Sequence, residues 1–80
     1  MREGTELSYE ELRAQAKQAV EASGKAYAEV ARELDVHRTA VARAVKEEGE
    51  KFQRLQREII QHLTPYRIER VVRFKARRDE

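Results

Sequence analysis

The sequence predicts a small, mainly α-helical domain of four helices that is followed by a C-terminal β-strand. Between residues 12 and 63, apolar residues recur every three or four positions, which is the period of an amphipathic helix. Gly24, Gly49 and Pro65 interrupt this period, and from residue 66 onward apolar and charged residues alternate. We therefore expect three segments: a flexible N-terminal arm at residues 1–7, a helical domain at 8–64, and a strand with a basic tail at 65–80.

Composition excludes several classes of protein. Eighty residues make one domain with a thin core, and the net charge of +2 is too small to force the chain open. There is no cysteine, which excludes a disulfide framework, a thiol nucleophile and a cysteine-based zinc site. Because no apolar run exceeds three residues, we expect neither a membrane-spanning helix nor a signal peptide.

Patterns that carry catalysis or bind metals are also missing. His37 and His62 are 25 positions apart, which is not the spacing of a metal site. The three glycines are isolated from one another, so the sequence has no glycine-rich phosphate loop. We expect no enzymatic activity, no metal, no cofactor and no small-molecule substrate.

The first helix is predicted over residues 8–23. Ser8 begins a capping box, in which its hydroxyl accepts from the backbone N–H of Glu11 and the Glu11 carboxylate reaches back to Ser8. Gly24 can adopt the left-handed conformation that ends a helix. The apolar residues of this segment share one helical face: Leu12, Ala16, and Ala19 or Val20.

A second helix is predicted over residues 25–34, and a third from His37 or Arg38 to about residue 48, just before Gly49. Asp35 and Val36 separate the two helices. Both have an apolar stripe at helical spacing. The stripes consist of Tyr27, Val30, Ala31 and Leu34 in the second helix, and of Ala40, Val41, Ala44 and Val45 in the third.

A fourth helix is expected from Phe52 to Leu63, where Thr64 and Pro65 end it. The alternative is one continuous helix from 38 to 63 with a heptad seam. Glu48 and His62 would interrupt that seam, and a glycine inside a helix costs about 1 kcal/mol. Two separate helices are therefore favoured.

The tail has the alternation of a β-strand. Tyr66, Ile68, Val72, Phe74 and Ala76 occupy every second position, a run that Arg70 interrupts, and they are rich in β-branched and aromatic types. The alternative interpretation is a helix, with a shorter stripe through Ile68, Val71, Val72 and Lys75. Because no other segment resembles a strand, its natural partner is the same segment of a second copy. We expect a homodimer, with Ile68, Val72 and Phe74 at the interface.

One stretch of the chain is distinctly basic. Residues 36–46 contain three basic side chains and no acidic one, and acids return directly afterwards in Glu47 and Glu48. A basic window on an otherwise balanced chain is typical of a surface that binds phosphate, although a solvated helix face can have the same composition. The three basic residues are Arg38, Arg43 and Lys46.

Residues 25–46 combine this basic window with a helical hairpin. Two short helices that cross steeply need a small residue at their closest approach, which Ala31 supplies, and a polar start to the second helix. The segment resembles the helix-turn-helix of the phage repressor and Cro family of DNA-binding proteins. The family usually has glycine in the turn where this chain has Asp35, a residue that tolerates the left-handed conformation. His37 replaces the usual small cap, so we expect Thr39 to share the capping.

This resemblance implies that the helix at 38–48 lies in the major groove of duplex DNA. The residues implied to read bases are His37, Arg38, Thr39, Ala42 and Arg43, and those implied to contact phosphate are Lys25, Tyr27 and Lys46. The implied function is that of a sequence-specific, dimeric transcription regulator, cytoplasmic and associated with the nucleoid. Two other functions remain open: a protein-interaction module of antitoxin or assembly type, and a nonspecific nucleic-acid binder.

Overall fold

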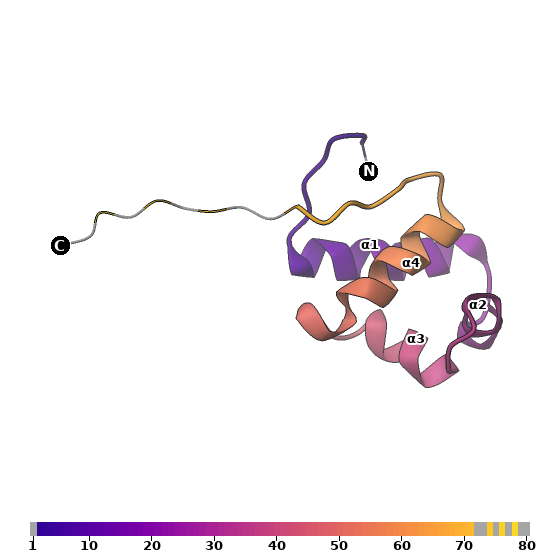
Figure 1. The fold of residues 1–80 in the computed structure, drawn as a ribbon. Coiled ribbons are helices and arrows are strands. Elements are labelled where there is room, and N and C mark those ends of the chain that lie inside the picture. Colours follow the sequence, from indigo (N-terminus) through magenta and orange to yellow (C-terminus); the bar gives the residue numbers. More distant parts are fainter. Residues whose placement is uncertain (1, 72–73, 75, 77, 79–80) are drawn as a thin grey trace.

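The computed structural model describes residues 2–71, 74, 76 and 78, and within them the chain is mainly helical. Figure 1 shows α1 and α4 side by side, with α2 and α3 below them. The most extensive packing joins α1 to α4 and α2 to α3, and α4 also contacts both α3 and α2. The elements are α1 (Tyr9–Ser23), α2 (Tyr27–Leu34), α3 (Arg38–Ala44), the 3₁₀ helix η1 (Glu50–Phe52) and α4 (Gln53–Leu63).

The helix predicted over residues 8–23 is present as α1, which begins one residue later, at Tyr9, with Ser8 as its N-cap. The Ser8 Oγ accepts from the Glu11 N–H at 3.2 Å, and the Glu11 Oε1 accepts from the Ser8 N–H at 3.2 Å, which completes the capping box. Gly24 ends the helix in the left-handed conformation, with φ 71°. Both ends are therefore set by local hydrogen bonds that the sequence signals directly.

Asp35 forms the turn between α2 and α3 in the left-handed conformation, with φ 57° and ψ 47°. The Val36 N–H donates to the Ala31 carbonyl at 2.9 Å, and the Asp35 N–H donates to the Arg32 carbonyl at 3.3 Å. These two bonds form a Schellman motif, which satisfies the last carbonyls of α2 and reverses the chain within three residues. The predicted turn chemistry is confirmed, although α2 begins at Tyr27 rather than at Lys25.

The third helix is shorter than predicted, because α3 ends at Ala44 and not at residue 48. Side chains from two other helices take up the carbonyls at its end. The Gln56 amide of α4 donates to the carbonyls of Ala44 (2.8 Å) and Glu47 (2.9 Å), and the Arg13 guanidinium of α1 donates to the carbonyl of Val45 (2.9 Å). These carbonyls already accept hydrogen bonds from side chains of other helices. Continuing α3 by another turn would therefore not provide them with hydrogen bonds that they lack.

Gly49 separates α3 from the last helix, which rules out the continuous helix from 38 to 63. Its φ of 115° lies in a region that favours glycine and is incompatible with helix. The chain then forms η1 before α4 begins at Gln53, so Phe52 lies in the 3₁₀ turn instead of in the fourth helix.

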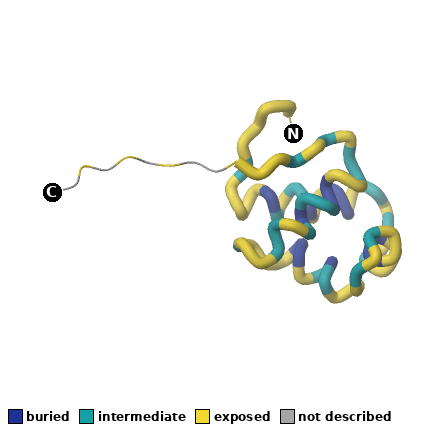
Figure 2. Tube along the Cα trace, in the orientation of Figure 1, coloured by how far each residue is buried: buried dark blue, intermediate teal, exposed yellow. Residues whose placement is uncertain are grey.

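The core is formed by small and branched residues where the four helices meet, as the dark-blue segments in Figure 2 indicate. Val30, Val41 and Ile59 have no exposed surface. The predicted stripes of all four helices contribute to this core, with Gln56 as the one buried polar residue among those described. Its apolar members are Leu12, Ala16, Ala19, Val20, Val30, Ala31, Val41, Ala44, Val45, Ile59 and Ile60.

The segment after α4 is irregular, and no described residue of it belongs to a β-strand. Tyr66 and Ile68 are half-buried against the core of their own chain, and the Ile68 N–H donates to the Gln61 Oε1 at 2.9 Å. Phe74 is 94% exposed, and Val72, the other expected interface residue, lies outside the described residues. No helix in the described part of the chain is long and apolar enough to span a membrane.

Candidate nucleic-acid interface

The helix α3 has one buried and one exposed face, as its sequence period predicts. Val41, Ala44 and Val45 pack into the core, and Figure 1 shows α3 steeply inclined to α2 at the edge of the molecule. His37, Arg38, Thr39 and Lys46 are exposed, whereas Ala42 is half-buried. Four of the five candidate base-reading residues, together with the candidate phosphate contact Lys46, are therefore exposed to solvent. We call this surface the α3 face: His37, Arg38, Thr39, Arg43 and Lys46.

Arg43 is exposed on the α3 face but already has partners. Its Nε donates to the Glu47 Oε2 at 3.0 Å, and its guanidinium carbon lies 5.2 Å from the centre of the Phe52 ring. An exposed ion pair at helical i,i+4 spacing contributes only about 0.3–0.5 kcal/mol. The guanidinium can thus exchange Glu47 for a base edge at small cost.

Lys25 and Tyr27 lie at the start of α2, where both are partly engaged within the chain. The Lys25 Nζ is 2.8 Å from each carboxylate oxygen of Glu33, and the His62 Nε2 is 2.6 Å from the same Glu33 group. The Lys25 ammonium and the His62 ring together lower the pKa of Glu33. Tyr27 is half-buried and packs on the core. Their engagement makes both residues weaker candidates for phosphate contacts than Lys46 is.

No side chain caps the N-terminus of α3, so the expected capping role of Thr39 is wrong. The His37 carbonyl instead accepts from the backbone N–H groups of Ala40 (3.0 Å) and Val41 (3.3 Å). The hydroxyl of Thr39 and the ring of His37 therefore remain on the α3 face without a structural task in the cap.

Acidic side chains border the other end of α3. Arg13 forms an ion pair with Glu10. This contact, together with a hydrogen bond between Glu48 and Glu10, lowers the pKa of Glu10 to about 2. The neighbouring Glu10 carboxylate raises the pKa of Glu48. Basic charge thus runs along α3 and just past its end, at Arg38, Arg43 and Lys46, and acidic charge gathers directly beyond it, at Glu47 and Glu48.

Sequence reasoning missed Gln56 and Arg13, which hold the C-terminal end of α3 in place. Both are polar residues on helices whose apolar stripes were evident, and neither has a local partner for its contact with α3. The only signal for Gln56 was its position beside Leu55 and Ile59, on the side of α4 that turns inward. They support the site without belonging to its exposed surface.

The described residues include no cluster of three or more His, Asp or Glu side chains that could hold a metal ion. No protein-family model matches the chain, and comparison with curated proteins and with solved structures finds no significant match.

Proposed function

We propose that the protein binds duplex DNA sequence-specifically as a transcription regulator, with α3 in the major groove. The observation that carries the proposal is the α3 face, a basic and solvent-facing helix surface on the second helix of a tight helical hairpin. An α-helix fits the width of the major groove, where arginine can contact guanine through two parallel hydrogen bonds.

We assign proposed roles to the residues of the α3 face and to the half-buried Ala42 beside it. Arg38 and Arg43 contact guanine, while His37, Thr39 and Ala42 contact neighbouring base edges. Lys46 contacts phosphate and fixes the position of the helix, assisted by Lys25 and Tyr27 from α2. The Schellman turn at Asp35 supports this assignment because it fixes α3 relative to α2.

We further propose that two copies associate through the C-terminal segment. Val71 is 64% exposed and Phe74 is 94% exposed, and large apolar side chains in such positions favour a partner surface. A strand that pairs with its counterpart would form only in the dimer. In that arrangement two α3 helices would read half-sites about one helical turn apart.

Affinity measurements with matched charge removal test the DNA-binding proposal. Log affinity falls with log salt, and Lys46→Ala should make this negative slope shallower by about 0.9, because one phosphate contact is lost. The control is Lys17→Ala, which removes the same charge from an exposed position on α1. The probe is a labelled pool of random-sequence duplexes, and circular dichroism verifies that each variant is folded.

Equal effects of Lys46→Ala and Lys17→Ala would show that the net charge, and not the α3 face, governs binding. No measurable binding of any duplex at low salt would favour the protein-interaction module instead.

A further inference from the structure

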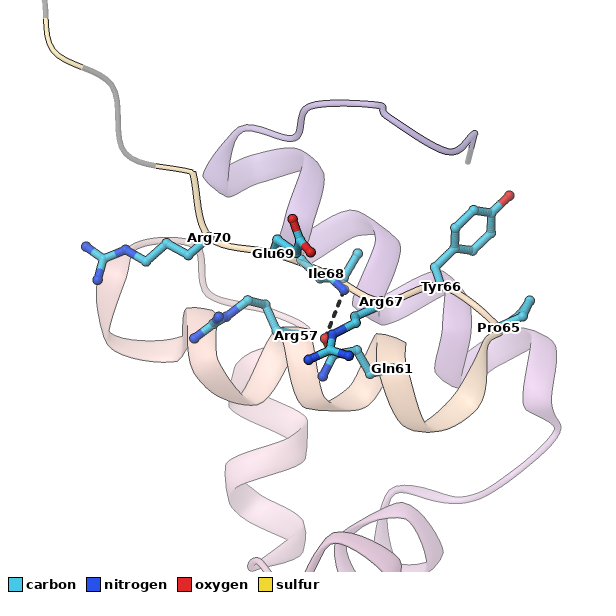
Figure 3. Close-up of a pocket in the computed structure, with 8 residues that line it drawn as sticks. All are labelled: Arg57, Gln61, Pro65, Tyr66, Arg67, Ile68, Glu69 and Arg70. Atoms are coloured by element: carbon cyan, nitrogen blue, oxygen red, sulfur yellow. Dashed lines mark hydrogen bonds between the residues drawn. The ribbon is translucent and has the colours of Figure 1, made fainter.

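A second basic surface lies on the opposite side of the molecule from α3. Figure 1 shows the segment after α4 running along the side of α1 and α4 that faces away from α2 and α3. Together with α4, this segment borders an open groove (Figure 3). The groove contains three arginines and one acidic residue: Arg57, Arg67, Arg70 and Glu69.

The path of the segment is fixed by hydrogen bonds to α4. The Thr64 Oγ1 donates to the Ile60 carbonyl at 2.6 Å and accepts from the Tyr66 N–H at 3.2 Å. Two residues later, the Ile68 N–H donates to the Gln61 Oε1, and the Ile68 side chain packs on the core. Arg67 is held between these two anchors, beside Arg57 of α4 (Figure 3).

Among the residues that the structure describes, these arginines form no ion pair, unlike two other arginines close to α4. Arg43 and Arg54 form ion pairs with Glu47 and Glu58, respectively. Within the described part of the chain, no such pair involves Arg57, Arg67 or Arg70, and the buried Nε of Arg57 has no hydrogen-bond acceptor. A partly buried guanidinium without an acceptor is costly unless an anion compensates it.

We propose that Arg57, Arg67 and Arg70 form a second phosphate-binding groove, which takes the sugar–phosphate backbone of a nucleic-acid segment other than the one against α3. The planar guanidinium binds phosphate oxygens through two parallel hydrogen bonds, so arginine suits this ligand better than lysine does. The groove is open and polar, which fits an extended backbone and not a small enclosed molecule. It gives the protein a second contact with nucleic acid on the face away from α3.

Site-resolved NMR on the full-length protein tests this proposal independently of the α3 face. The backbone amides and arginine Nε–H groups are followed while a short random-sequence duplex is added. The proposal expects shifts at Arg57, Arg67 and Arg70 in addition to any at α3. Shifts confined to α3 would overturn the proposal of a second phosphate-binding groove and leave the proposed function intact. Shifts confined to the groove would support the groove and contradict the proposed role of α3. If no signal shifts, both proposals are wrong.

Further titrations identify the ligand class. If single-stranded RNA shifts the groove signals at a lower concentration than duplex DNA does, the groove binds RNA. If duplex DNA acts at the lower concentration, the groove binds DNA. Both results agree with a backbone phosphate site. Inorganic phosphate that acts at the same concentration as the oligonucleotides, or a polyglutamate peptide that binds as tightly, would overturn the assignment to nucleic acid.

A double variant gives a second readout. Arg57→Gln with Arg67→Gln should make the negative slope of log affinity against log salt shallower by about 1.8, since each phosphate contact contributes about 0.9. Lys17→Gln with Arg32→Gln removes the same charge from exposed positions on α1 and α2 and should make the slope shallower by less than half as much. Equal losses in the two double variants would mean that these arginines act only through the net charge.

Discussion

Gln56 is the residue on which the end of α3 depends most. Its side chain has no exposed surface, and its amide nitrogen donates to the carbonyl of Ala44, the last residue of α3, and to the carbonyl of Glu47 beyond it. An unsatisfied buried carbonyl costs about 1–3 kcal/mol. The buried amide thus connects the packing of α4 to the position of the proposed reading helix.

Gln56→Ala should lower the free energy of unfolding by about 2–4 kcal/mol, because it leaves the buried Ala44 carbonyl without this donor, removes the bond to the part-buried Glu47 carbonyl and opens a cavity. Urea denaturation measures this change. Gln18→Ala, at an exposed position on α1, is the control and should change stability by less than about 0.5 kcal/mol. A loss for Gln56→Ala as small as that of the control would contradict the capping role.

Asp35 adopts a conformation that glycine adopts without strain. Asp35→Gly should therefore raise the free energy of unfolding by roughly 0.5–1 kcal/mol, while Asp35→Val should lower it by at least about 1 kcal/mol. The thermal unfolding midpoints of the two variants should move in opposite directions. Equal midpoints would mean that the left-handed turn does not persist in solution.

Among the elements, α2 is held to α4 by the contacts of Glu33. The carboxylate binds the Lys25 ammonium and the His62 ring, and the Lys25 and His62 hydrogen bonds hold the pKa of Glu33 below its ordinary value of 4.5. A carboxyl whose pKa is lower in the folded state stabilises the fold above its unfolded pKa. This stabilisation is lost as the pH falls through the folded pKa.

Glu33→Gln should accordingly be less stable than the wild type at neutral pH, and the difference should shrink as the pH falls below about 4.5. The measurement is the free energy of unfolding of both proteins between neutral and strongly acidic pH. A difference that stays constant across this range would show that the charge of Glu33 does not contribute.

The elements also show which features the sequence predicts and which it does not. Local hydrogen bonds define the ends of α1 and the turn at Asp35, so short motifs reveal them. The end of α3 depends on Gln56 and Arg13, which lie far from it in the chain and give no local signal. The alternation after residue 65 does not distinguish a strand from a segment in which Ile68 packs on its own core.

In the candidate site, too, local features could be predicted from the sequence and long-range contacts could not. Helical period predicts which side of α3 is exposed, because the opposite side must be buried. The pair of Arg43 and Glu47 is readable from its i,i+4 spacing. By contrast, the contact between Lys25 and Glu33 spans eight residues and forms only once the chain folds around α2.

For the molecule as a whole, we predict association of two copies through the C-terminal segment. Sedimentation should detect a reversible dimer at micromolar concentration, and Phe74→Glu should shift it to monomer by placing a charge in an apolar interface. Arg78→Glu, a charge change at another exposed position of the tail, is the control. A wild-type protein that is monomeric at this concentration without DNA would rule out the dimer there.

If α3 reads the base sequence of duplex DNA, the protein should select particular sequences from a library of random duplexes, and this selection is the most direct test. The wild-type protein should enrich a short motif, and Arg38→Ala should relax the preference at one position of it, at a cost of about 1–3 kcal/mol for the preferred sequence. Lys17→Ala should enrich the same motif as the wild type. A library that stays random after selection, or an identical motif for Arg38→Ala, would contradict the claim.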